Sequence, residues 1–213
     1  MSTKTKTKRE PIIIPGNFAP SWATLHAELI GLTPLLMHSP QAMKATAKGP
    51  AKSKKEIPTP EIEAERAAYR DADGQLVMPA KNVYRSLAEA GTQLKNPDNK
   101  RATLKKVFGA ALMPPMVEAF PLIDPDTGEL LSEYEIDIQR VVVQRAAVMR
   151  ARPRFDKWAL RVEVVYDEEV IPEPETVATG LSIAGQKIGL GDFRPEKGGF
   201  YGRFTVGSIE VER

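Results

Sequence analysis

The stretch from residue 185 to residue 206 restricts the possible folds of this chain more than any other part of the sequence. Six glycines are interspersed there with four basic and four aromatic residues. Apolar residues at helical spacing precede it, at positions Val177, Leu181, Ala184 and Ile188. The alternation from Phe200 to Val206 is typical of a strand. The chain is therefore expected to end in a helix, a glycine-rich loop and a strand.

The same stretch has the chemistry of an anion-binding loop. Glycines let a phosphodiester backbone come close to exposed N–H groups, and basic side chains add positive charge. The dinucleotide-binding motif is excluded, because its glycines follow a strand and precede a helix, which is the reverse order. The alternative is a connection that needs glycine only for turning. The candidate phosphate-binding residues are Lys187, Gly189, Gly191, Arg194, Lys197, Gly199, Gly202 and Arg203.

Residues 140 to 154 form a second basic stretch, with no acidic residue before Asp156. Arginine forks pair with phosphates in a bidentate manner, and their planes stack on bases. We therefore expect an arginine-rich strand that lines a groove for single-stranded nucleic acid. The candidate residues in it are Arg145, Arg150, Arg152 and Arg154.

Two further lysine-rich segments are interpreted as flexible. Residues 1–20 are expected to form a basic N-terminal arm, and residues 41–58 a long basic loop that includes Lys52, Lys54 and Lys55. A loop of this length is either functional or disordered, so a flap over nucleic acid and an insertion without a partner both stay open. The net charge is only +2, and a nucleic-acid surface would have to come from uneven placement of charge.

The order of elements predicts one α+β domain over residues 21–213. Core strands are expected over residues 22–32, 157–166 and 200–211, with a helix over about 174–188. Between them we expect a helix that begins at Thr59-Pro60, helices over 79–94 and 100–112, a short strand over 75–78, and a hairpin of strands 116–123 and 130–138. The predicted architecture is a ferredoxin-like or RRM-like antiparallel sheet with helices on one face and long insertions. Its open face is expected to join the glycine-rich loop in one positive surface.

Several classes of protein are excluded by composition. The chain has no cysteine and two histidines far apart in sequence, so we expect no disulfide, no metal site and no cofactor. No apolar run reaches the ~18 residues that a membrane span needs, and the lysine-rich start is unlike a secretory signal. We therefore expect a cytoplasmic protein without a membrane partner.

The glycine-rich stretch resembles the glycine-rich loop of the RAMP superfamily, the RNA-binding backbone and processing subunits of CRISPR systems. It is also similar to the ending of uncharacterised bacteriophage proteins. The residues that carry the resemblance are Gly189, Gly191, Arg194, Gly199, Gly202 and Phe204. The resemblance implies RNA as the ligand, a homo-oligomer or filament along the strand, and a bacterial or phage-infected cell as the setting.

The function expected from these features is non-catalytic binding of single-stranded nucleic acid, with RNA preferred over DNA. Two alternatives stay open. One is a metal-independent RAMP-type endoribonuclease in which His38 acts as general base or acid. The other is a phage structural or protein-interaction module whose glycine-rich loop contacts a neighbouring subunit.

Overall fold

A computed structural model describes residues 21–40, 58–97, 99, 101–113, 116–143 and 146–213. The expected N-terminal arm lies outside the described residues, as does nearly all of the expected 41–58 loop with Lys52, Lys54 and Lys55. Arg145 lies outside them as well. The side chains discussed below belong to the described part.

The central sheet has three long antiparallel strands in the order β7-β1-β8. They are β1 (Trp22–Gly31), β7 (Ala159–Asp167) and β8 (Phe204–Glu212). In β1 buried and half-buried residues alternate, with Leu25 and Leu29 fully buried, because successive side chains point to opposite faces of a strand. The predicted inward face of the first strand is confirmed. The last strand begins at Phe204, later than the sequence indicated, because residues 200–203 belong to the loop.

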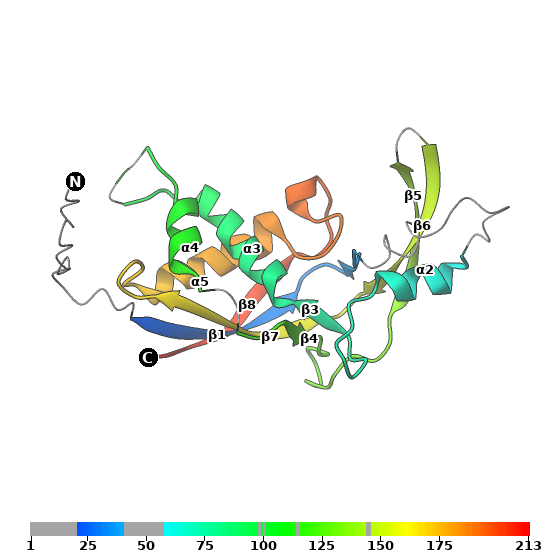
Figure 1. Cartoon of the computed structure of the whole chain (residues 1–213), viewed down its shortest axis with the longest axis horizontal. Helices are drawn as coiled ribbons and strands as arrows, with labels where there is room; N and C mark the ends of the chain where they lie inside the picture. Colours follow the sequence, from blue (N-terminus) through cyan, green and yellow to red (C-terminus); the bar gives the residue numbers. More distant parts are fainter. Residues whose placement is uncertain (1–20, 41–57, 98, 100, 114–115, 144–145) are drawn as a thin grey trace, which may run out of the picture.

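Three helices cover one face of this sheet (Figure 1). They are α3 (Ala80–Ala90), α4 (Lys105–Ala111) and α5 (Pro174–Ile183), and a π-helical turn (Ala184–Ile188) extends α5. Leu87 of α3, Phe108 of α4 and Leu181 of α5 are fully buried in one core with the inward side chains of the sheet. Burying such a side chain stabilises the fold by about 1.5–3 kcal/mol. The α+β class is thereby confirmed.

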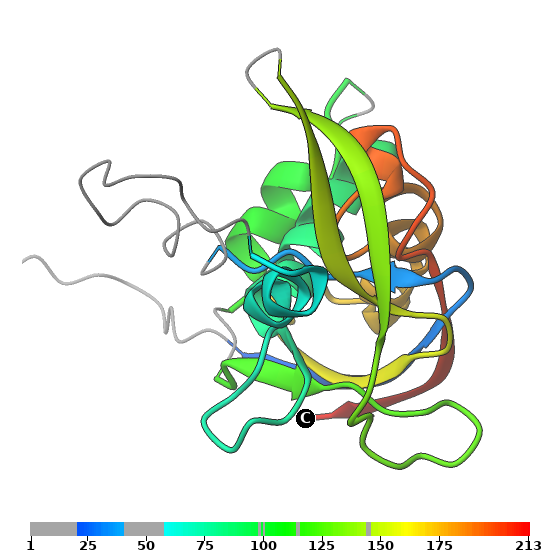
Figure 2. The same cartoon turned by 90° about the vertical axis from the view of Figure 1, so that its right-hand side faces the viewer.

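A long two-stranded ribbon extends from one end of the body (Figures 1 and 2). It consists of β5 (Glu135–Val143) and β6 (Ala146–Phe155), and β2 (Leu35–Leu36) pairs with the base of β6. The helix α2 (Pro60–Ala67) packs on β6, where the Glu63 carboxylate accepts a hydrogen bond from the Ala151 N–H at 3.2 Å. The described candidates Arg150, Arg152 and Arg154 all lie on β6, as an arginine-rich strand requires. Residues 140–143 belong to β5, so the basic stretch is divided between two strands.

The expected hairpin of strands 116–123 and 130–138 is also wrong. The short β4 (Ala119–Pro121) pairs with β3 (Val77–Pro79), and β5 pairs with β6. The turn itself is present, because Ile123 bridges Leu130 and the Asp124 carboxylate caps the backbone of residues 126 and 127. Ile123 also bridges Ala159, which brings β4 alongside β7.

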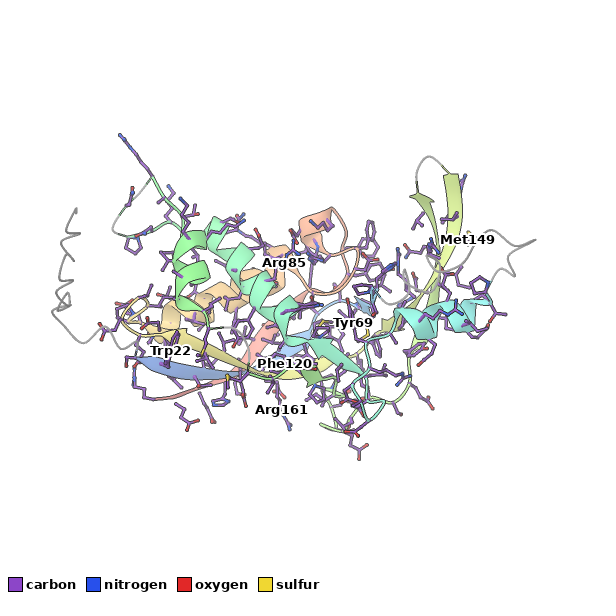
Figure 3. The ribbon with its side chains drawn as sticks, in the orientation of Figure 1. Trp22, Tyr69, Arg85, Phe120, Met149 and Arg161 are labelled. Carbon is purple, nitrogen blue, oxygen red and sulfur yellow. The ribbon has the colours of Figure 1, made fainter. Side chains whose placement is uncertain are left out.

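The open face of the central sheet is acidic, which corrects the expectation of a positive surface there. The side chains of Glu28, Glu163 and Glu210 line a hollow on this face together with His26 and Arg161. Glu212 joins them, 3.4 Å from His26. Figure 3 shows Arg161 on this side, away from the helices. The error arose because the basic loop and the open face were assigned to one side of the molecule from their order in the chain.

No helix in the described part of the chain is long and apolar enough to cross a membrane.

Candidate nucleic-acid interface

The glycine-rich loop is shaped by close backbone contacts. Gly202 has φ 67°, in the left-handed region, and a Cβ there would lie 1.9 Å from the Leu190 carbonyl oxygen. A Cβ on Gly199 would lie 1.7 Å from the Phe193 carbonyl oxygen. Real Cβ atoms do not approach so closely, so both positions require glycine for packing.

Many N–H groups of the loop are used within the protein. The N–H of Leu190 donates to Gly202, that of Asp192 to Leu36, and that of Gly202 to Pro34, all at 2.8–2.9 Å. The amides of Gly189 and Gly199 also donate to carbonyls of the chain. These amides hold the loop against β2 and the end of α5, so contacts with a ligand fall mainly to side chains.

Five of the predicted cations form ion pairs with neighbouring carboxylates. The pairs are Arg150–Glu63 at 2.8 Å, Arg152–Asp192 at 2.9 Å, Arg154–Asp156 at 2.7 Å, Arg194–Glu196 at 2.5 Å and Lys197–Glu196 at 3.3 Å. Lys187 is exposed and has no ion pair with any described residue. The Arg203 guanidinium donates to the Gln186 carbonyl and so lies against the end of α5. The surface formed by the glycine-rich loop and β6 is therefore less positive than the sequence suggested.

Three aromatic rings gather on the loop beside the ribbon. The ring centroids of Phe200 and Tyr201 are 4.5 Å apart, and those of Phe193 and Phe200 are 5.6 Å apart. Phe200 is 58% exposed and Phe193 39% exposed, while the Tyr201 hydroxyl accepts a hydrogen bond from the Gln139 side chain of β5 at 3.1 Å. Phe193 adopts a positive φ of 47°, which is unfavourable for a residue with a Cβ. We call these three residues the aromatic cluster.

A polar cleft of about 210 Å³ lies between the loop, α3 and the segment after β2. Arg85 and Asn82 of α3 line one side, and Asp192, Arg194 and Glu196 of the loop line another, with His38, Tyr69, Ser86 and residues 189–191 completing the wall. Arg85 is exposed and forms no ion pair with the residues that the structure describes. Figure 3 shows Arg85 on the side of α3 that faces the loop. An unpaired arginine at the edge of a polar cleft is available to a ligand.

His38, Arg152 and Asp192 meet at the back of this cleft. The Arg152 Nε lies 2.9 Å from Asp192 Oδ2 and donates to His38 Nδ1 at 3.3 Å, and His38 Nδ1 lies 3.7 Å from the same carboxylate. Burial lowers the pKa of His38 below its ordinary value, and this outweighs the opposing effect of Asp192. A neutral ring that accepts at Nδ1 carries its proton on Nε2. The predicted residues His38 and Arg152 are thus brought together with the glycine-rich loop.

Sequence reasoning missed Arg85 and Asn82, and it did not identify the aromatic cluster as a group. The signal for Arg85 was available, because Asn82 and Arg85 are three residues apart and share a helix face. The signal for the cluster was the presence of Phe193, Phe200 and Tyr201 among the glycines, although Phe200 was assigned to the alternation of the last strand. Neither signal says which other segment the residues would face.

A scan against the models of known protein families finds no match, and a search of curated proteins finds none either. The described residues contain no group of three or more acidic, histidine or cysteine side chains arranged to hold a metal ion.

Proposed function

We propose that the protein binds single-stranded nucleic acid, RNA in preference to DNA, without a catalytic step. The observation that carries the proposal is the aromatic cluster, in which Phe193 and Phe200 are exposed and Tyr201 is buried, beside a ribbon and a cleft that both present arginines. Base stacking on aromatic rings is worth about 1–3 kcal/mol per base, and it needs unpaired bases. A double helix offers no free base faces to such a surface, which is why a single strand is the better ligand.

The path of the strand follows from the cations that remain unpaired. Arg85 at the cleft, Lys187 at the end of the π-helical turn and Arg140 on β5 are exposed and form no ion pair within the described part of the chain. We infer that bases stack on Phe193 and Phe200 while the phosphates pass these three cations. The three arginines of β6 that form ion pairs, Arg150, Arg152 and Arg154, then support the surface. Lys187 contacts phosphate directly.

The finer fold assignment belongs to the same proposal. The order β8-β1-β7, with β4 bridged to β7 and helices on one face, supports a ferredoxin-like arrangement. Membership of the RAMP superfamily and assembly into a filament along the strand are proposed on the resemblance of the glycine-rich loop. The preference for RNA rests on that resemblance too.

Fluorescence anisotropy with labelled oligouridylate, oligothymidylate and duplex of equal length tests the proposal. We expect the two single strands to bind, oligouridylate more tightly, and the duplex to bind at least tenfold more weakly. Equal binding of duplex and single strand would contradict stacking as the source of affinity. A purified protein that binds none of them and forms a discrete oligomer would favour the structural-module alternative.

One observation favours RNA cleavage as a second candidate function. His38 is neutral and lines a cleft with Tyr69 and Arg85, and its Nε2 makes no hydrogen bond to the described residues. The nitrogen that could take a proton from a 2′-hydroxyl group is Nδ1, which accepts from Arg152, so cleavage would require the ring to exchange that hydrogen bond for one with the substrate. Incubation with labelled RNA tests this candidate. Products that end in a 2′,3′-cyclic phosphate and disappear in His38→Gln would support it, whereas intact RNA would exclude it.

A further inference from the structure

The cleft is lined by charges of both signs, although it lies beside the proposed nucleic-acid surface. Its lining contains two cations, Arg85 and Arg194, and two carboxylates, Asp192 and Glu196. Each carboxylate is paired with an arginine, Asp192 with Arg152 at 2.9 Å and Glu196 with Arg194 at 2.5 Å, whereas Arg85 has no ion pair with a described residue. A phosphate group inside the cleft would lie close to both carboxylates, and like charges at short range repel. We therefore expect the strand's phosphates to meet Arg85 at the edge of the cleft and not to enter it.

The size of the cleft suits a single small ring system. An internal cavity of about 150 Å³ holds benzene, and pockets for drug-sized ligands measure about 300–1,000 Å³. The cleft, at about 210 Å³, lies between these limits. A single nucleobase is of this size, and a whole nucleotide with its sugar and phosphate is larger.

The lining also has the polar groups that a base edge requires. Asn82 contributes an amide and His38 an Nε2–H donor, while the carboxylates are acceptors. The Tyr69 hydroxyl donates to the His38 carbonyl at 3.1 Å, so it offers a base only an acceptor. Bases present donors and acceptors side by side on their pairing edges, and proteins read unstacked bases through these groups. Both carboxylates are already oriented, Asp192 by Arg152 at 2.9 Å and Glu196 by Arg194 at 2.5 Å.

We propose that the cleft holds one nucleobase turned out of the bound strand. This proposal rests on the proposed function and adds a subsite to it. Asp192 lies in the cleft wall and Phe193, the next residue, belongs to the aromatic cluster. One base enters the cleft while its neighbour stacks on Phe193. The site would give a base preference to a surface that otherwise binds any sequence.

Titration of ¹⁵N-labelled protein with the four ribonucleosides and with ribose 5-phosphate tests the inference. We expect at least one nucleoside to shift the amide signals of residues 189–192 in a saturable way, and ribose 5-phosphate to leave them unchanged. In Asn82→Ala the nucleoside should bind about threefold to tenfold more weakly, the effect of one lost hydrogen bond. Lys81→Ala is the matched control, because Lys81 is the exposed neighbour on α3 and lies outside this cleft.

Two results would overturn the inference. Ribose 5-phosphate that shifts the same signals at equal or lower concentration would make the cleft a phosphate site. Nucleosides that shift none of them at tens of millimolar would remove the base site. Anisotropy with oligouridylate on the same sample separates the two proposals. If the oligonucleotide binds and no nucleoside does, only the base site fails, and if neither binds, the proposed function fails with it.

Discussion

Phe200 is the residue on which the proposed binding depends most directly. Its ring is 58% exposed and contacts the rings of Phe193 and Tyr201. Replacement by alanine should weaken oligouridylate binding by about 1–3 kcal/mol, or about 5- to 150-fold, because one stacked base is lost. Anisotropy measures the change. Trp22→Ala is the control, since Trp22 is 40% exposed on β1, outside the aromatic cluster, and should leave affinity unchanged.

The buried imidazole of His38 makes a prediction about pH. Burial lowers its pKa in the folded protein relative to the unfolded chain, where a histidine titrates near 6.5. The unfolded state therefore binds more protons as the pH falls through about 6.5, and folding stability is lost in that range. The variant His38→Gln should lose stability less steeply, by at most about 1.4 kcal/mol per pH unit. Urea unfolding between pH 7.5 and 5 gives both slopes, and parallel slopes would show that His38 does not titrate there.

At the level of elements, the attachment of the ribbon to the glycine-rich loop depends on Arg152 and Asp192. Arg152 is 9% exposed, and Asp192 is its carboxylate partner at 2.9 Å. Removal of the carboxylate in Asp192→Ala should lower the free energy of unfolding by about 1–3 kcal/mol, because a buried guanidinium loses a charged partner. In the double variant with Arg152→Met the losses should not add, and the coupling energy should be about 0.5–3 kcal/mol. Additive losses in urea unfolding would mean that the pair contributes nothing to the junction.

The loop itself gives a second prediction at this level. Gly198 and Gly202 have similar positive φ values of 76° and 67°, but only Gly202 has a carbonyl oxygen where a Cβ would be. Gly198→Ala should therefore destabilise by about 1–2 kcal/mol from backbone strain alone. The variant Gly202→Ala should destabilise by clearly more, because the loop must also move. Denaturant unfolding measures both free energies of unfolding. If the two variants lose the same amount, the close contact with Leu190 relaxes without a cost in stability.

The strands and helices with strong periodicity were predictable, and the pairing of distant segments was not. The strand over residues 22–32 and the helical spacing of Val177 and Leu181 depend only on local sequence, and both were confirmed. The division of residues 140–154 between β5 and β6 was not predicted, because no glycine or proline separates Val143 from Ala146 in the sequence. In the candidate site, the arginines were found by their residue type. The carboxylate partners of Arg150 and Arg152 come from α2 and from the loop, so no local pattern could have identified them. Asp156 and Glu196, by contrast, lie within two residues of the cations that they pair with.

At the scale of the whole molecule, charge is divided between surfaces. The glutamates on the open face of the sheet lie on the side away from the helices, and the exposed cations Arg85 and Lys187 lie near the glycine-rich loop. A net charge of +2 conceals this separation. In our proposal this distribution, seen in the described part of the chain, directs a negatively charged strand to the loop side of the body.

This distribution predicts which basic side chains release counterions from the nucleic acid when it binds. The variant Lys187→Ala should reduce the slope of log K against log salt by about 0.7, since Lys187 has no ion pair with a described residue and contacts phosphate in our proposal. The variant Arg154→Ala should leave the slope unchanged, because Asp156 already pairs with that guanidinium at 2.7 Å. Anisotropy over a range of salt concentrations measures both slopes. A larger change in Arg154→Ala would show that the ion pair opens when the strand binds.

The backbone N–H groups of the loop donate hydrogen bonds within the protein, and this bears on which residues of the loop can be substituted. Because Leu190, Asp192 and Gly202 hold the loop through their backbone groups, its shape does not depend on the exposed side chains of Lys197 or Phe200. A library that randomises those exposed positions should therefore yield mostly folded proteins. Selection on immobilised oligonucleotides could then change ligand preference without redesign of the scaffold, much as loop grafting does in antibody domains.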